Sequence, residues 1–457
     1  MLEIRGKLPA GVERIHFIGI GGSGMFPLVQ ILKGQGFAIT GSDNNEGDIV
    51  ELERQMGIPV TIGQRAENIA GADMIVYTAA ILPGNPELEA AKASGLPLWE
   101  RAKMLGVISS CFADAICVCG THGKTTTTAL LTQILLEAGK DPSAVIGGKL
   151  PAIGGYGRAG ESDVLVCESC EFQDHFLQLS PDVAVILNVD ADHLEYFGTL
   201  ENIIRSFHQF ASMASRLVIA NGDDPNTRKA VAGCGKPVIT FGLGEENDYY
   251  ARNVVAHGGM RRSFDLMKKG GEKVVTLDIH LPGQHNVLNA TAAAVAALET
   301  GVTPQALAAA MPHFAGAGRR FEVLGERQGV TVADDYAHHP AEIAATLRAA
   351  KELPFVRVWA VFQPFTYSRT RLLMDDFAKA LSLADRVVLS EIMGSREVNT
   401  YGVSTQELAD RIPGSVWYPT FQEMADYVAA NARPGDLVIT LGCGDVYKCA
   451  RMILHHP

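Results

Sequence analysis

The sequence G-T-H-G-K-T-T at residues 120–126 combines residue types that bind phosphate groups. An apolar run at 115–119 precedes it and a helical pattern at 127–136 follows it. A strand, a glycine-rich turn and a helix in this order direct unpaired backbone N–H groups at an anion, which the helix dipole also favours. Lys124 could reach the outer phosphates of a nucleotide, and the Thr125 hydroxyl could bind the accompanying magnesium. We therefore predict a phosphate-binding loop, although it is two residues shorter than the usual spacing and a structural glycine turn is the competing interpretation.

A second glycine-rich sequence, G-I-G-G-S-G at 19–24, lies between a predicted strand at 15–18 and a predicted helix at 25–32. Asp43 follows Gly24 by 19 residues, after a second predicted strand at 37–40. This is the pattern of a dinucleotide-binding fold, in which a pyrophosphate approaches the helix N-terminus and the acid binds a ribose hydroxyl. It permits an NAD-dependent oxidoreductase. Because a UDP-sugar also carries a pyrophosphate, the ligand stays open at this point.

Two polar residues beyond the phosphate-binding loop are candidate metal ligands. Glu168 ends a predicted strand at 164–167, and His193 follows another at 183–187. In an open parallel sheet the carboxyl ends of strands form the ligand-binding edge, so both residues are expected to face Thr125. Magnesium prefers oxygen ligands, which leaves His193 equally open to interpretation as a surface histidine. Cys167 and Cys170 form a C-x-x-C without a second pair, which disfavours zinc or redox chemistry.

Composition excludes several classes of protein. A chain of 457 residues with 47% hydrophobic and 20% charged residues is typical of a globular protein of about three domains. A net charge of -12 argues against a nucleic-acid partner. No apolar run reaches the roughly 18 residues of a membrane span, and the N-terminus lacks the pattern of a signal peptide. We therefore expect a cytoplasmic protein without a membrane anchor, whose eight scattered cysteines are reduced.

Predicted strands and helices alternate along the whole chain. A strand at 74–77 and helices at 86–93 and 102–108 complete a first domain, residues 1–108. The central domain, residues 109–313, contains the phosphate-binding loop. A stretch rich in small residues at 312–318 introduces a third α/β domain, residues 314–457. Its predicted strands lie at 330–333, 358–362, 386–389 and 437–441, and proline opens its first helix.

Seven motifs together resemble those of the Mur ligases of peptidoglycan synthesis, in the same order and over essentially the whole chain. They are G-I-G-G-S-G-M at 19, G-T-H-G-K-T-T-T-T at 120, D-A-D-H at 190, P-G-Q-H-N-V-L-N-A at 282, G-R-R-F-E at 318, D-D-Y-A-H-H-P at 334 and F-Q-P-F-T-Y-S-R-T at 362. The resemblance implies an N-terminal Rossmann-like domain, a central P-loop ATPase domain with a mostly parallel sheet, and a C-terminal Rossmann-like domain. It implies that ATP and Mg²⁺ drive the joining of a carboxylate to an amine through an acyl phosphate.

Within the family the chain most resembles the branch that joins L-alanine to UDP-N-acetylmuramate. The branch that recycles a murein tripeptide usually carries G-I-C-G-T where this chain has G-I-G-G-S at 19–23. That branch and the NAD-dependent oxidoreductase remain as alternatives. Many members have histidine where this chain has Phe365, so amino-acid selectivity rests on other residues. The oligomeric state is left open.

The resemblance also implies a role for individual residues. Lys124, Glu168, His193 and Arg320 are implied to be catalytic, and Thr125, Glu168 and His193 to bind metal. The implied ATP-binding residues are Gly120, Thr121, His122, Gly123, Lys124, Thr125, Thr126, His285, Asn286, Asn289, Arg320 and Asp335. Those implied to bind the UDP-sugar are Gly19, Gly21, Gly22, Ser23, Gly24, Ser42 and Asp43, and those implied to bind the amino acid are Tyr336, His338 and Arg369.

Overall fold

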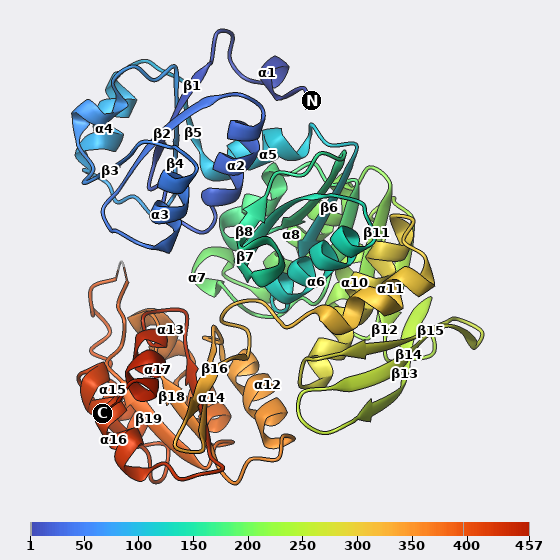
Figure 1. The fold of residues 1–457 in the computed structure, drawn as a ribbon, viewed down its shortest axis with the longest axis vertical. Coiled ribbons are helices and arrows are strands. Elements are labelled where there is room, and N and C mark those ends of the chain that lie inside the picture. The colour runs from blue at the N-terminus through green and yellow to red at the C-terminus, as the bar shows by residue number, and fades with distance from the viewer. Residues whose placement is uncertain (1, 396, 457) are drawn as a thin grey trace. The chain divides into compact units, whose positions relative to one another are not determined.

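The computed structural model describes residues 2–395 and 397–456, and the strands of these residues form three sheets. The colours of Figure 1 show that the sheets come from three consecutive stretches of the chain, blue, green to yellow, and orange to red. By their contacts the described residues fall into two compact units. The first comprises Met1–Asn253, Asp265–Leu277 and Leu288–Phe314, and the second Val254–Phe264, Asp278–Val287 and Ala315–Pro457. The division into domains 1–108, 109–313 and 314–457 stays a prediction.

The N-terminal sheet has five described strands, all parallel, in the order β3-β2-β1-β4-β5. The glycine-rich loop leaves β1 beside the point where this order reverses, which is where parallel sheets bind ligands. The strands are β1 (Arg14–Ile18), β2 (Ala38–Asp43), β3 (Val60–Ile62), β4 (Met74–Tyr77) and β5 (Leu98–Glu100). The helices are α1 (Ile4–Lys7), α2 (Phe26–Gly34), α3 (Asp48–Gln55), α4 (Pro86–Ala93) and α5 (Arg101–Ser109), with the 3₁₀ helix η1 (Ala66–Ile69).

The middle sheet has ten described strands in the order β15-β14-β13-β12-β11-β10-β6-β9-β7-β8. From β12 to β7 neighbouring strands are parallel, and β8 runs antiparallel to β7. The strands are β6 (Asp114–Cys119), β7 (Ser143–Leu150), β8 (Gly155–Arg158), β9 (Val164–Glu168), β10 (Val183–Ile186), β11 (Leu217–Asn221), β12 (Val238–Gly242), β13 (Tyr249–Ala256), β14 (Arg262–Lys268) and β15 (Glu272–Ile279). The phosphate-binding loop follows β6, which lies between β10 and β9.

The helices of the middle stretch are α6 (Lys124–Glu137), α7 (Leu194–Phe197), α8 (Leu200–Met213), α9 (Pro225–Val231), α10 (Gln284–Glu299) and α11 (Pro304–Ala310), with 3₁₀ helices η2 (Pro151–Ile153), η3 (Phe172–Gln178) and η4 (Met311–His313). In α6 every residue from Thr125 to Leu135 is buried, so this stretch has no solvent-exposed face. Such a helix forms only where its neighbours cover it on all sides. The start of α6 is therefore held firmly by packing.

The C-terminal sheet has six described strands in the order β16-β17-β21-β18-β19-β20, parallel except for the pair β16 and β17. The strands are β16 (Glu322–Arg327), β17 (Val330–Asp335), β18 (Val358–Phe362), β19 (Arg386–Ser390), β20 (Val416–Tyr418) and β21 (Leu437–Leu441). The helices are α12 (Pro340–Lys351), α13 (Tyr367–Leu372), α14 (Met374–Leu381), α15 (Thr405–Ala409), α16 (Phe421–Asn431) and α17 (Tyr447–Leu454).

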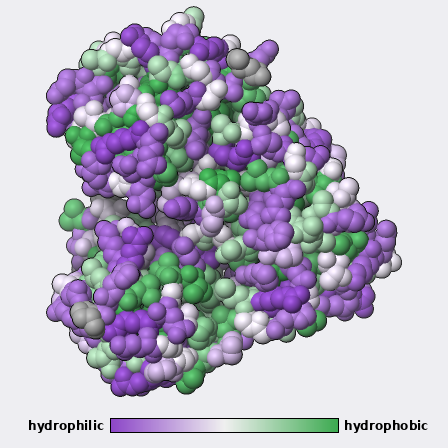
Figure 2. Space-filling model, in the orientation of Figure 1, coloured by the Kyte–Doolittle hydropathy of each residue, from purple (hydrophilic) through white to green (hydrophobic). Residues whose placement is uncertain are grey.

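The predicted fold class, α/β with mostly parallel sheets, is confirmed. None of the helices in the described part of the chain is long and apolar enough to cross a membrane. On the face drawn in Figure 2, hydrophilic residues cover most of the surface and hydrophobic residues form separate patches. The apolar side chains are instead gathered against the sheets, where strands such as β18 and β21 are buried along their whole length.

Candidate active site

The phosphate-binding loop has the shape that the sequence predicts, but its helix begins earlier. α6 starts at Lys124 rather than at residue 127, because Gly123 adopts a left-handed conformation (φ +86°) that ends the loop. A Cβ atom on Gly123 would lie 2.3 Å from Oδ1 of Asn289, so only glycine fits. The loop and Asn289, both predicted to bind ATP, are thus in contact.

Asn188, which directly follows β10, fixes the shape of this loop. Its side-chain oxygen accepts from the N–H of His122 (2.8 Å), and its amide donates to the His122 carbonyl (3.0 Å). The Thr121 N–H donates to the Asn188 carbonyl at 3.0 Å, and the N–H of Asp190 donates to the Thr121 hydroxyl at 2.9 Å. Asn188 was not predicted to be a site residue, although its position after the strand next to β6 was the available signal. Contacts of Thr121 and His122 with ATP stay a prediction.

Lys124 is bound by its own loop and by a glutamate. Its Nζ donates to the carbonyls of Gly120 (2.6 Å) and Thr121 (3.1 Å) and lies 2.8 Å from Oε2 of Glu171. Burial lowers the pKa of Lys124, but the charge and hydrogen bond of Glu171, together with the nearby Cys170 and Glu168, outweigh burial, so the pKa is raised. The lysine is therefore fully charged, and an incoming phosphate would compete with Glu171 for it.

Glu168 and Thr125, two of the predicted metal ligands, are in direct contact. The Thr125 hydroxyl donates to Oε1 of Glu168 at 2.8 Å, and the N–H of Gly147 donates to Oε2 at 2.6 Å. A Cβ atom on Gly147 would lie 2.7 Å from both carboxylate oxygens, so the close approach requires glycine. Oxygen atoms of this kind are the ligands that Mg²⁺ prefers. Among the described residues, no group of three or more His, Cys, Asp or Glu side chains is arranged to hold a metal ion by itself.

Through its side chain, His193 contacts residues close to it in the sequence and one aromatic ring of η3. Its backbone is left-handed (φ +53°), its Nδ1 is 3.3 Å from Oε1 of Glu195 and its Nε2 is 3.8 Å from Oδ2 of Asp192. Its ring packs on Phe172 with centroids 4.8 Å apart. These contacts orient the imidazole without joining it to Thr125 or Glu168, so its metal-binding role stays a prediction.

The first glycine-rich loop is shaped by residues at the end of β2. The N–H groups of Gly19 (2.8 Å) and Ile20 (3.0 Å) donate to the Ser42 carbonyl, and the Gly21 N–H donates to Oδ2 of Asp43 (3.0 Å). The hydroxyl of Ser42 is fully buried and donates away from the loop. Ser42 and Asp43 therefore act first on the loop itself, and their contact with a UDP-sugar stays a prediction, as it does for Gly22 and Ser23.

Arg101, which the sequence analysis did not name, lies beside the end of this loop. Its guanidinium is 3.4 Å from the position of a Cβ atom on Gly24. Arg101 is the first residue of α5 and directly follows β5, at the ligand-binding edge of the sheet. A basic residue after a parallel strand was the signal that could have identified it.

In the second unit, Arg319 joins the segments that carry the remaining candidates. Its Nε is 2.8 Å from Oδ2 of Asp334, and its Nη2 donates to the Gly442 carbonyl at 2.6 Å. Its guanidinium lies 5.0 Å from the centre of the Tyr336 ring, and that of Arg320 lies at the same distance from this ring. Arg320 and Tyr336, predicted to bind ATP and the amino acid, are thus brought together by a residue to which the sequence analysis gave no role.

Asp335, the last residue of β17, is buried between these segments. Its carboxylate accepts from the N–H groups of Phe321 (2.8 Å) and Ala337 (2.7 Å). Burial raises the pKa of Asp335 to about 6, against the opposing charge of Arg320. The side chain therefore closes a turn beside Arg320, and its contact with ATP stays a prediction.

The other amino-acid candidates lie on nearby elements of the same unit. His338 Nδ1 is 3.3 Å from Oε2 of Glu342 in α12. Arg369 lies in α13, which Thr366 caps with a strained backbone (φ +62°) and a hydroxyl that accepts from the Arg369 N–H at 3.4 Å. The charge of Arg369 also reaches the half-buried thiol of Cys443, whose pKa is raised to about 12 mainly by desolvation. Of the adenine candidates, Asn286 donates to the Pro282 carbonyl at 2.7 Å, and His285 lies against Gly283.

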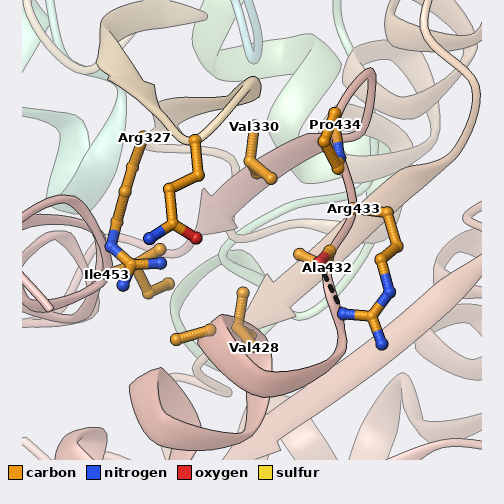
Figure 3. Close-up of a pocket in the computed structure, with 9 residues that line it drawn as sticks. Arg327, Val330, Val428, Ala432, Arg433, Pro434 and Ile453 are labelled. Atoms are coloured by element: carbon orange, nitrogen blue, oxygen red, sulfur yellow. Dashed lines mark hydrogen bonds between the residues drawn. The ribbon is translucent and has the colours of Figure 1, made fainter. Parts of the chain in front are cut away.

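A pocket of about 220 Å³ in the same unit contains none of these residues (Figure 3). Val330, Val428 and Ile453 contribute apolar side chains to it, and Arg327 and Arg433 stand at its sides. The Arg433 guanidinium donates to the carbonyls of Ala430 (2.9 Å) and Ala432 (3.0 Å), at the end of α16. Its charge therefore stabilises a helix C-terminus, and the pocket gives no separate indication of a ligand.

Three consecutive segments of the chain match domains of one protein family. Residues 14–113 match the Mur ligase family catalytic domain, 118–297 the Mur ligase middle domain and 319–444 the Mur ligase glutamate ligase domain. The UDP-N-acetylmuramate–L-alanine ligase of Caldanaerobacter subterraneus subsp. tengcongensis is 42% identical over 448 residues, 97% of each chain. That of Agathobacter rectalis is 42% identical over 447 residues, 96% of this chain and 97% of the relative.

Solved structures are similar over the same length. UDP-N-acetylmuramate-alanine ligase MurC of Thermotoga maritima has a TM-score of 0.82 at 28% identity, covering 96% of this chain and 98% of that one. The murein peptide ligase of Psychrobacter arcticus has a TM-score of 0.75 at 25% identity, covering 97% and 98%. Three Mur ligase domains match in order along the chain, and a curated relative is 42% identical over 97% of each chain. The contact of Thr125 with Glu168 at the start of α6 is consistent with these matches. The chain belongs to the Mur ligase family.

Proposed function

We propose that this protein is an ATP-dependent ligase that joins L-alanine to UDP-N-acetylmuramate and releases ADP and phosphate. The observation that carries the proposal is the contact between Thr125 and Glu168 directly after Lys124 at the start of α6, in a chain that matches an L-alanine ligase over 97% of its length. A carboxylate is a poor electrophile, and this cluster provides what its activation by ATP needs.

The first step transfers a phosphoryl group. An oxygen of the sugar carboxylate attacks the γ-phosphorus, the bond from that phosphorus to ADP breaks, and an acyl phosphate forms. The N–H groups at the start of α6 and the Lys124 ammonium bind the phosphates, which releases Lys124 from Glu171. Thr125 and Glu168 would hold Mg²⁺, which neutralises charge on the phosphate oxygens. The protein's contribution is thus placement and fixed charge.

The second step forms the amide bond. The uncharged amine of L-alanine attacks the carbonyl carbon of the acyl phosphate, a proton leaves the nitrogen, and inorganic phosphate departs with the former carboxylate oxygen. We assign the amino-acid carboxylate to the planar guanidinium of Arg369, which can donate two parallel hydrogen bonds. Because this chain has Phe365 where many family members have histidine, binding of the amino acid relies on Arg369 without a contribution from that histidine.

The glycine-rich loop after β1 is the proposed site of the UDP-sugar. The N–H groups of the loop that are not bonded to Ser42 or Asp43 can donate to a diphosphate, the guanidinium of Arg101 can neutralise part of its charge, and Asp43 maintains the loop. The oxidoreductase alternative assigns no role to Lys124 or Glu168. Because ATP and UDP-sugars are cytoplasmic metabolites, the cytoplasm is the proposed location.

Phosphate release from ATP tests the proposal. The enzyme is assayed with Mg²⁺ and UDP-N-acetylmuramate, and L-alanine, glycine, L-serine and the murein tripeptide are added separately. Release that requires both the sugar and L-alanine is the expected result. Release driven by the tripeptide would instead identify a recycling ligase, and absence of release with every amine would refute the proposal.

A further inference from the structure

A buried carboxylate lies beneath the glycine-rich loop of the first unit. Glu87 of α4 is fully buried, and its Oε1 is 2.7 Å from Nε2 of His16. Its Oε2 accepts from the Ser42 hydroxyl (2.7 Å) and from the Asn68 amide (3.1 Å). The other ring nitrogen of His16 is 2.8 Å from the Thr40 hydroxyl. Burying a carboxylate is costly unless its oxygens are satisfied, and here each of them is.

This network connects β1 and β2 near the carboxyl ends of both strands, next to the glycine-rich loop. His16 lies in β1, two residues before its end, and pairs with Thr40 of β2. The last residue of β1, Ile18, pairs with Ser42. Glu87 therefore joins β1 and β2 through one residue on each, immediately before the chain leaves β1 for the loop.

Ser42 transmits this constraint to the loop. Its hydroxyl donates to Glu87, while its carbonyl accepts from the N–H groups of Gly19 (2.8 Å) and Ile20 (3.0 Å). Because the Ser42 hydroxyl is held by Glu87, the orientation of the Ser42 carbonyl, which accepts from the loop, is also restrained. Without the carboxylate, Ser42 would keep its place in β2 but its carbonyl would lose one of the restraints on its direction.

We propose that Glu87, oriented by His16 and acting through Ser42, is a positioning residue for the UDP-sugar. It holds the backbone of the loop in place before the diphosphate arrives, so that binding does not have to order it. The inference rests on the proposed function, because it assigns the sugar nucleotide to this loop. Glu87 is too deeply buried to contact the substrate, so its effect reaches the ligand only through the backbone.

The variant Glu87→Gln tests the proposal against Glu89→Gln, a matched control in the same helix. Glu89 is exposed, and its Oε1 lies 2.8 Å from Nζ of Lys92 at the surface. Glutamine has the shape of glutamate but carries one donor where both oxygens of Glu87 accept. We expect the KM for UDP-N-acetylmuramate to rise about tenfold in Glu87→Gln, while kcat and the KM values for ATP and L-alanine change less than about twofold. Glu89→Gln should match the unmodified enzyme in all four constants.

Ser42→Ala provides a second, milder variant in case Glu87→Gln does not fold. It removes the link to Glu87 and leaves the pair of Glu87 and His16 in place. Its KM for the sugar should rise about fivefold, and the affinity for UDP alone, measured by calorimetry, should fall by the same factor. An unchanged KM for the sugar in both folded variants, or equal changes in every KM, would overturn the inference. Failure of the unmodified enzyme to need the sugar would instead refute the proposed function.

Discussion

Glu53 provides a quantitative test of the first unit, because its carboxyl is buried without a partner. The residue lies in α3 and is fully buried, and neither carboxylate oxygen accepts a hydrogen bond from the described residues. Burial, with a smaller contribution from the charge of Asp43, raises the pKa of Glu53 from 4.5 to about 8. Glu53 is therefore protonated in the folded protein at neutral pH and ionised in the unfolded chain.

The sign and size of the effect on stability follow from this difference. A raised folded-state pKa means that the folded protein binds one proton more than the unfolded chain between pH 4.5 and about 8. Within that interval, each unit of rising pH lowers the free energy of unfolding by up to about 1.4 kcal/mol. The whole interval corresponds to at most about 5 kcal/mol. The variant Glu53→Gln cannot ionise and should lack this dependence.

Hydrogen exchange of the α3 amides, compared at several pH values after correction for the intrinsic rate, measures the local free energy. Relative to the unmodified enzyme, Glu53→Gln should be similarly protected near pH 5 and progressively better protected towards pH 8.5. Glu51→Gln changes an exposed glutamate of the same helix and provides the control. A difference between Glu53→Gln and the unmodified enzyme that is the same at every pH would refute a protonated, partnerless Glu53.

Three further substitutions test the other sites. Lys124→Ala should lower kcat about 10²- to 10³-fold, because it removes a fixed charge that stabilises phosphoryl transfer; unchanged ATP turnover would contradict the assigned loop. Gly123→Ala should weaken ATP binding at least about tenfold in calorimetry, since its Cβ would lie 2.3 Å from Asn289 in a left-handed backbone, and normal affinity would show that the loop adapts. Arg319→Lys should lower kcat about tenfold with the fold retained by circular dichroism, because lysine lacks the fork that also reaches the Gly442 carbonyl; full activity would exclude a role for this arginine in the site.

Local patterns were sufficient to predict many elements of the fold. The strands at 74–77, 358–362 and 437–441 have the predicted bounds because apolar runs ended by polar or glycine residues describe buried parallel strands well. The start of α6 was placed three residues late, since the threonines after Lys124 lack a helical pattern of their own and are helical through packing. The three strands β13–β15 were not predicted, because their alternation of exposed and buried residues is irregular.

Positions in the site divide in the same way. Lys124, Thr125 and Glu168 were identified from residue type and position after a strand, and the structure brings them together. Asn188 and Arg319 act through hydrogen bonds to backbone groups distant in the sequence, and such partners follow no spacing rule. Ser42 was predicted to bind the UDP-sugar from the family resemblance, and the structure shows its hydroxyl donating to the buried Glu87.

The sequence by itself determined the family and the α/β class and predicted a phosphate-binding loop, since these depend on residue types at short, fixed spacing. Only the tertiary structure decided which polar groups contact the residues of the two glycine-rich loops and the strand ends beside them. Glu171 beside Lys124, Gly147 against Glu168, and Glu87 between His16 and Ser42 are pairs formed across 47, 21, 71 and 45 residues of chain. Their energies arise from burial and direct contact, which exist only once the sheets have placed the strand ends side by side.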